Sequence, residues 1–138
     1  MKRHTSLIKL SREHHRALAL AKRARQADGG AIDVQADLAL EIAGIFKREI
    51  EGHFQAEENS LLPRLDKAGL EIPVKRTLSE HKALRELVAQ LAEGEISRLG
   101  KFGELLAAHV RFEERELFPL AESVLTTESL DLLDQELS

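Results

Sequence analysis

Four histidines and two glutamates in this chain have the residue types and the spacing of ligands in a metal site. Residues 53–63 read His-x3-Glu-Glu-x2-Leu-x-Pro, and residues 109–119 repeat that pattern. A Glu-His pair comes before each copy of the pattern, at Glu13-His14 and at Glu80-His81. We therefore interpret the chain as two similar halves. Each half offers one histidine from its first helix and a histidine with a carboxylate from its second.

Helical geometry separates the two glutamates of each motif. An α-helix turns about 100° per residue, so Glu57 lies about 40° from His53 on the apolar stripe, and Glu58 lies about 140° away. The first glutamate of each pair is therefore predicted to point inward, and the second, Glu58 or Glu114, is predicted to face water. The predicted metal ligands are His14, His53, Glu57, His81, His109 and Glu113.

Two positions near these ligands stay open. His14 is followed by apolar residues at helical spacing and His15 by two charged ones, so His14 is the predicted ligand and His15 its alternative. Glu49 lies one turn before His53 on the same face. It is either an additional ligand or the partner of Arg85 in an ion pair, and the ion pair is favoured.

The desolvation cost of these side chains favours a metal site over an ordinary polar core. Two carboxylates and four imidazoles buried without a compensating cation would cost several kcal/mol per unpaired charge. Mixed imidazole and carboxylate donors suit iron, manganese or zinc. If the two carboxylates bridge two ions, two histidines remain for each ion, and the centre is dinuclear with open coordination positions.

Composition limits the class of protein. The 138 residues are long enough for one domain, 43% are hydrophobic and 32% are charged, and Leu, Ala and Glu are abundant. The absence of cysteine excludes disulfides, zinc-thiolate sites, iron–sulfur clusters and thiol catalysis. A net charge of −4 gives no reason to expect a nucleic-acid partner. The first ten residues lack the apolar core of a signal peptide and no apolar run is long enough to cross a bilayer, so we expect a cytoplasmic protein without a membrane partner. We expect it to be a monomer or a homodimer.

The spacing of apolar residues and helix breakers predicts an all-α fold. We expect a single domain over residues 1–138, an antiparallel up-down-up-down four-helix bundle over about 5–125 with a short C-terminal helix over about 127–137. The second helix is expected to break at Pro63 and the fourth to carry its motif to Pro119.

The chain resembles the hemerythrin-like family of HHE cation-binding domains over roughly Leu7 to Leu125. The two His-x3-Glu-Glu segments ending in Leu-Leu-Pro and Leu-Phe-Pro carry this resemblance. The resemblance implies two iron ions in an oxo- or hydroxo-bridged centre, with Glu57 and Glu113 as bridges and the four histidines as terminal ligands. Zinc or manganese are the alternative ions.

One departure from the family pattern bears on function. Oxygen-carrying hemerythrins have a second histidine four residues from the ligand on the third helix, whereas His81 has Thr77 and Arg85 at that spacing. Reversible oxygen carriage is therefore disfavoured. The leading hypothesis is a non-haem di-iron protein that binds oxygen, nitric oxide or peroxide for sensing, detoxification or iron handling.

Two alternatives come from other classes of protein. The first is an iron store or donor for the repair of iron centres, and the second is a bundle with a purely structural ion such as zinc. Hydrolytic enzyme motifs are missing, since there is no His-Glu-x-x-His zinc helix and no phosphate-binding glycine loop. Peroxidase- or oxidase-like turnover at iron stays open.

Overall fold

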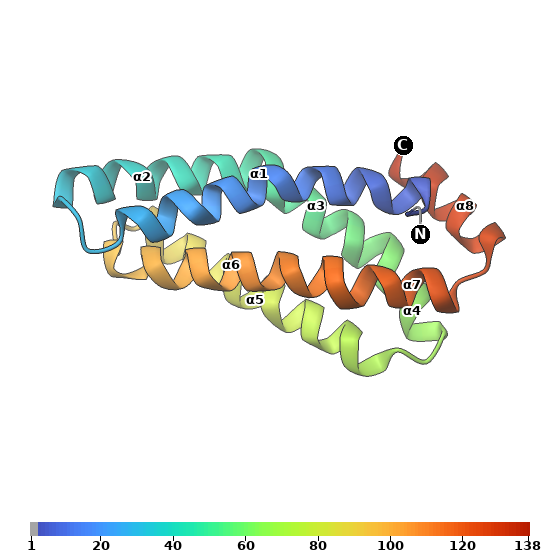
Figure 1. The fold of residues 1–138 in the computed structure, drawn as a ribbon. Helices are drawn as coiled ribbons and strands as arrows, with labels where there is room; N and C mark the ends of the chain where they lie inside the picture. Colours follow the sequence, from blue (N-terminus) through green and yellow to red (C-terminus); the bar gives the residue numbers. More distant parts are fainter. Residues whose placement is uncertain (1–2) are drawn as a thin grey trace.

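The computed structural model describes residues 3–138, and this part of the chain forms helices and the short turns between them. The two unbroken long helices are α1 (Thr5–Ala27) and α5 (Glu71–Ala92). The second long helix consists of α2 (Ile32–Ile45), η1 (Phe46–Ile50), α3 (Glu51–Ala56), η2 (Glu57–Leu61) and α4 (Leu62–Lys67). The fourth consists of η3 (Ile96–Arg98), α6 (Leu99–Phe112), η4 (Glu113–Leu117) and α7 (Phe118–Val124), and α8 (Thr127–Leu137) follows it. The long helices lie side by side (Figure 1), which confirms the predicted all-helical bundle.

Both motifs contain a wide π-helical turn that begins at the first glutamate of the pair. These turns are η2, from Glu57 to Leu61, and η4, from Glu113 to Leu117, and each ends two residues before the proline of its motif. Proline clashes with the carbonyl of a preceding helical turn and cannot donate a hydrogen bond. The wider turn changes the hydrogen-bond register just before the proline. The prediction that the second helix breaks at Pro63 is therefore wrong, because the helix continues to Lys67.

Close contact between α1 and α6 depends on one glycine. A Cβ at Gly103 would lie 2.6 Å from the carbonyl oxygen of Ala21 and 2.7 Å from a side-chain carbon of Arg25. A larger residue would push the two helices apart. This contact matters for the site because α1 and α6 each supply one of the predicted ligands.

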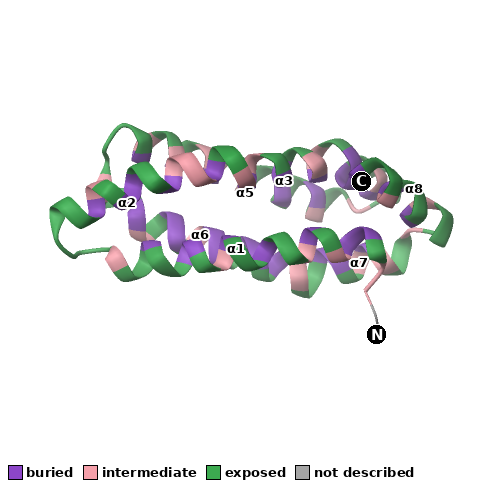
Figure 2. Ribbon diagram, turned by 90° about the horizontal axis from the view of Figure 1, so that it is seen from above, coloured by how far each residue is buried: buried purple, intermediate pink, exposed green. Residues whose placement is uncertain are grey.

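Two apolar cores occupy the two ends of the bundle. One is built around Ile42, Leu91 and Phe102, and the other around Leu7, Leu65 and Phe118. Burial follows the inward faces of the helices (Figure 2), as expected for amphipathic helices. No helix among residues 3–138 has the length and apolar composition needed to cross a bilayer.

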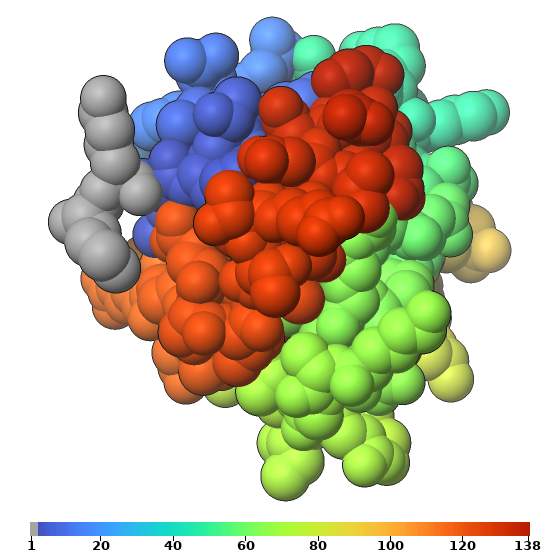
Figure 3. Space-filling view, turned by 90° about the vertical axis from the view of Figure 1, so that its right-hand side faces the viewer, coloured from blue at the N-terminus to red at the C-terminus, as the bar shows by residue number. Residues whose placement is uncertain are grey.

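The short C-terminal helix seals one end of the bundle. Leu130, Leu133 and Leu137 of α8 are buried in the same core as Leu7 and Leu10 of α1. Figure 3 shows α8, in red, lying across this end of the molecule between the blue N-terminal helix and the green segment. The apolar stripe of α8 is therefore part of the core in this chain.

Candidate metal centre

Six polar side chains meet in the interior between the two apolar cores. The structure brings the following residues into two groups, within each of which the candidate ligand atoms lie within 4.8 Å of one another: His14, His53, Glu57 and Glu113 in the first, and Glu57, His81, His109 and Glu113 in the second. All six residues are buried. Both groups contain Glu57 and Glu113, so the two carboxylates lie between two pairs of imidazoles.

Each imidazole directs its Nε2 atom at the central carboxylates. His14 Nε2 lies 2.8 Å from Glu113 Oε1, and His109 Nε2 lies 3.3 Å from Glu113 Oε2. The Nε2 atoms of His53 and His81 lie 3.3 Å and 3.1 Å from the Oε2 and Oε1 atoms of Glu57. The four rings therefore surround the two carboxylates, and each ring presents one nitrogen to them.

Most of these inward atoms have no hydrogen-bond partner among the described residues. The unpartnered atoms are Nε2 of His53, His81 and His109, both side-chain oxygens of Glu57, Oε2 of Glu113, and Oε2 of Glu49. Buried polar atoms are nearly always hydrogen-bonded, because an unsatisfied one costs roughly 1–3 kcal/mol. A cation bound among the atoms from the six residues would satisfy them together, and imidazole with carboxylate donors suits iron, manganese or zinc. The residues present therefore fit a metal site.

A second set of glutamates holds the other nitrogen of each ring. Glu58 Oε2 lies 2.6 Å from His81 Nδ1, and Glu114 Oε2 lies 2.7 Å from His14 Nδ1. The prediction that Glu58 and Glu114 face water is therefore wrong. Their side chains are only partly exposed, at 21% and 33%. In each motif the wide π turn begins at the first glutamate, and the two adjacent glutamates hold opposite nitrogens of one ring on a neighbouring helix.

The glutamates of the two Glu-His pairs do the same for the remaining rings. Glu13 Oε1 lies 3.0 Å from His53 Nδ1, and Glu80 Oε1 lies 2.7 Å from His109 Nδ1. Carboxylates at this position fix the tautomer of a metal-binding histidine and raise its basicity. Sequence reasoning assigned no role to these glutamates. The signal was available in the repeat, which contains four histidines and four further glutamates at matching positions.

These four contacts connect the helices in a closed ring. Glu13 of α1 binds the histidine of α3, Glu58 of η2 binds that of α5, Glu80 of α5 binds that of α6, and Glu114 of η4 binds that of α1. We call Glu13, Glu58, Glu80 and Glu114 the outer glutamates.

Three of the outer glutamates are also paired with an arginine. Arg85 donates to both oxygens of Glu58, at 2.8 and 3.2 Å. Arg76 donates to Glu80 at 3.1 Å, and Arg3 donates to Glu114 at 3.3 Å. Glu13 forms no ion pair with an arginine among residues 3–138, and it is also the most exposed of the four, with 40% of its side chain accessible.

In the metal-free protein, the carboxylates favour protonated imidazoles. Burial opposes the charge on His109, but the negative charge of Glu113 and the hydrogen bond to Glu80 outweigh burial and raise the pKa of His109 to about 10. Against burial, Glu113 and Glu114 raise the pKa of His14, and Glu57 raises that of His53. Burial would raise the pKa of Glu113, but His109, His14 and His53 hold it well below its ordinary value. Positive charge on these three imidazoles therefore offsets the charge of Glu113 when no metal is bound.

Phe54 closes one side of the cluster. Its ring stacks on the imidazole of His81 at a centroid distance of 3.8 Å and meets that of His109 edge-on at 5.6 Å. His81 has no exposed surface. The half of the cluster around His81 is therefore shielded from water.

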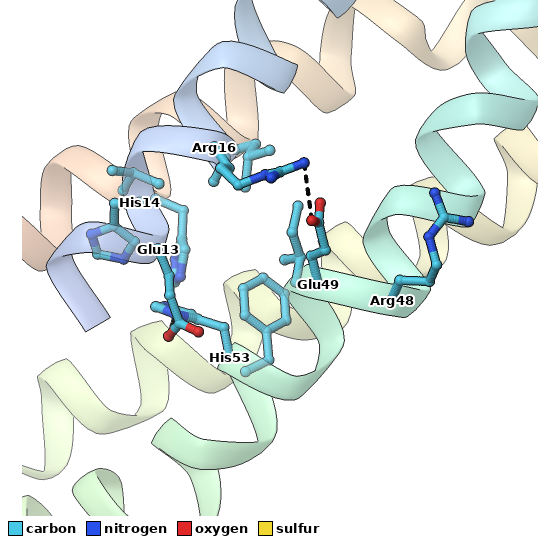
Figure 4. A pocket seen from close by; sticks show the side chains of 12 residues that line it. Glu13, His14, Arg16, Arg48, Glu49 and His53 are labelled. Carbon is cyan, nitrogen blue, oxygen red and sulfur yellow. Dashed lines mark hydrogen bonds and ion pairs between the residues drawn. The ribbon is translucent and has the colours of Figure 1, made fainter. Parts of the chain in front are cut away.

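The structure decides the two assignments that the sequence left undecided, His14 against His15 and the role of Glu49. His14 is buried in the cluster, whereas His15 is exposed and belongs to neither group. Glu49 also belongs to neither group, and the predicted pair of Glu49 with Arg85 is wrong. Glu49 Oε1 lies 2.9 Å from Arg16 Nη2 (Figure 4). Arg85 binds Glu51 and Glu58 instead, because the register between helices places it beside them.

Comparison with known proteins adds a family to this geometry. A family model described as the hemerythrin HHE cation-binding domain matches residues 5–121, a span that contains all six clustered side chains. No curated protein and no solved structure gave a match. With His and Glu groups arranged to hold cations and a match over most of its length, the chain belongs to the hemerythrin HHE cation-binding domain family.

Proposed function

We propose that this chain binds two iron ions in an antiparallel up-down-up-down bundle, and that the centre takes a small oxygen or nitrogen species. The observation that carries the proposal is the convergence of buried, unpartnered nitrogen and oxygen atoms on two groups that share Glu57 and Glu113. In this proposal Glu57 and Glu113 would hold both ions. His14 and His53 would complete the binding of one ion, and His81 and His109 that of the other.

The number of protein donors supports open coordination positions. Each group offers two imidazoles and oxygens from two shared carboxylates. The side chains flanking His81 add no donor, because the Thr77 hydroxyl donates to the Pro73 carbonyl oxygen at 2.9 Å and Arg85 is held by two glutamates. Iron bound here would supply redox chemistry and affinity for oxygen, nitric oxide or peroxide. The expected roles are sensing, detoxification or iron handling, without reversible oxygen carriage.

The protein's own part is to orient the donors and to exclude water. Each outer glutamate accepts a proton-bearing Nδ1, which leaves the Nε2 lone pair of that ring directed at the centre. Phe54 and the two apolar cores keep bulk water away from the carboxylates. Low polarity around a site strengthens every electrostatic interaction within it.

Anaerobic loading with ferrous ion followed by elemental analysis tests the proposal. We expect two irons per chain, and a change in the optical spectrum on titration with oxygen, nitric oxide or peroxide. Two irons without any spectral change would favour the iron store or donor. One ion per chain, or zinc bound in preference to iron, would favour a structural site, and either result would contradict the di-iron proposal.

A further inference from the structure

A cavity of about 310 Å³ lies directly against the candidate metal centre. Its lining includes three of the clustered histidines, His14, His53 and His109, with Glu13 beside them. His81 does not line the cavity, and its ring stacks on Phe54 at 3.8 Å. A small molecule therefore has a space in which to approach the centre beside three of its four histidines.

The wall of this cavity combines apolar and charged side chains. The apolar lining residues are Ala17, Ile50, Phe54, Leu106 and Val110, and the charged ones are Glu13, Arg16, Arg48 and Glu49. A diatomic molecule such as nitric oxide suits this space, because it carries no charge for these groups to retain and loses little hydration on entry.

An ion pair between two helices spans the cavity. Arg16 of α1 and Glu49 of η1 both line the cavity and lie 2.9 Å apart (Figure 4). The Arg16 side chain is 72% exposed, whereas Glu49 Oε2 is buried and has no hydrogen-bond partner among the described residues. The pair therefore lies between solvent and the interior of the cavity, with the arginine on the outside.

We propose that the Arg16–Glu49 ion pair is a gate across this cavity, and that it sets how fast a small uncharged ligand reaches the centre. An ion pair this exposed favours its closed state by only about two- to fivefold, because water and salt compete with it. The gate therefore opens often, and it slows entry without preventing it. This inference rests on the proposed iron site.

The gate makes a kinetic prediction. In Arg16→Met the aliphatic stem remains and the charge is lost, so the gate no longer closes. We expect nitric oxide to associate with the ferrous variant about three- to sixfold faster than with the ferrous wild type in anaerobic stopped-flow measurements, because a gate closed two- to fivefold more often than open leaves only a third to a sixth of the chains open. Iron release to a chelator should accelerate by a similar factor. Raising ionic strength should accelerate the wild type towards the variant and leave the variant unchanged.

The chain offers a matched control between the same two long helices. Arg23 of α1 pairs with Glu41 of α2 at 2.6 Å, and the hollow that both residues line contains none of the six clustered side chains. Arg23→Met should leave both rates within the error of the wild type. The reversed pair, Arg16→Glu with Glu49→Arg, should restore the wild-type rate, because the attraction across the cavity is regained.

A cavity-filling change tests the route itself. Ala17→Val adds two methyl groups to the cavity wall and should slow nitric oxide association without lowering the iron content. Equal rates for Arg16→Met and Arg23→Met, or a rate unaffected by Ala17→Val, would overturn the inference while the iron site stands. A wild-type chain that binds no iron would instead contradict the proposed function on which the inference rests.

Discussion

The exchange Glu58→Gln tests whether the outer glutamates hold the histidines for metal binding. Glu58 Oε2 accepts from His81 Nδ1 at 2.6 Å and from Arg85 Nη1 at 2.8 Å, and its Oε1 accepts from Arg85 Nη2 at 3.2 Å. A glutamine has one oxygen and one NH2 group at these positions. With its oxygen at the Oε2 position it still accepts from His81 and from Arg85 Nη1, but its NH2 group then faces Arg85 Nη2. The variant therefore offers His81 at best a neutral amide oxygen in place of a carboxylate, and a neutral acceptor holds the imidazole N–H less strongly.

Loss of the negative charge on this acceptor should weaken metal binding. Removing the partner of a metal-binding histidine costs about 10- to 100-fold in metal affinity, which corresponds to about 1.4–2.7 kcal/mol. Competition with a chelator of known affinity measures this change. Circular dichroism melting in the presence of EDTA checks that the metal-free variant is folded.

Glu51→Gln is the matched control for this prediction. Glu51 also accepts from Arg85, at 2.8 Å from Nε and 2.7 Å from Nη2, but no hydrogen bond joins it to a histidine among the described residues. We expect its metal affinity to stay within about threefold of the wild type, because Arg85 is partly exposed and its ion pairs contribute little. Equal losses of affinity in the two variants would refute the role assigned to Glu58.

Three further predictions follow from the same structure. Removing the metal should lower the melting temperature, and adding it back at 100 times its dissociation constant should stabilise the fold by about 2.7 kcal/mol for each ion bound, in denaturant titrations. The pKa of His109 is raised from 6.5 to about 10, since neighbouring carboxylates outweigh burial. The charge on His109 therefore stabilises the metal-free protein fully below about pH 6.5, and this stabilisation is lost as the pH rises towards 10. In EDTA, the free energy of unfolding should be a few kcal/mol lower at pH 10 than at pH 7. The metal-loaded protein should not show this loss. Leu133→Ala should remove about 2–5 kcal/mol of stability, because Leu133 is fully buried where α8 seals the bundle, and iron content should be unchanged in the folded variant.

The burial of the candidate ligands can be predicted from the sequence, because it depends only on which face of its own helix each residue lies on. A turn of about 100° per residue is enough to show which side of a helix faces the interior. That reasoning placed His53 and Glu57 inside and favoured His14 over His15, and the structure has His14 buried and His15 exposed. The spacing of apolar residues also predicts the C-terminal helix α8, but it does not show what that helix packs against. Only the structure shows that Leu130 packs in the same core as Leu7.

The outer glutamates were missed because their contacts are between helices. Regular helical geometry predicts that Glu58 faces water. In the structure a wide π turn begins at Glu57, and Glu58 contacts His81 on α5. The periodicity of one helix contains no information about its register against the next. For the same reason the sequence paired Glu49 with Arg85, although Arg16 lies closer in the folded chain. The proline two residues after η2 and after η4 was a local sign of irregularity in the two motifs.

The ring of outer glutamates explains why the motif occurs twice. Within the first half of the chain, Glu13 satisfies His53, but His14 depends on Glu114 of the second half. Likewise His81 of the second half depends on Glu58 of the first. Each candidate metal group also needs a carboxylate from both halves, because Glu57 and Glu113 belong to both groups. A single half would therefore leave one imidazole without its acceptor and each group without one carboxylate, so docking of the two halves and completion of the metal centre are the same event.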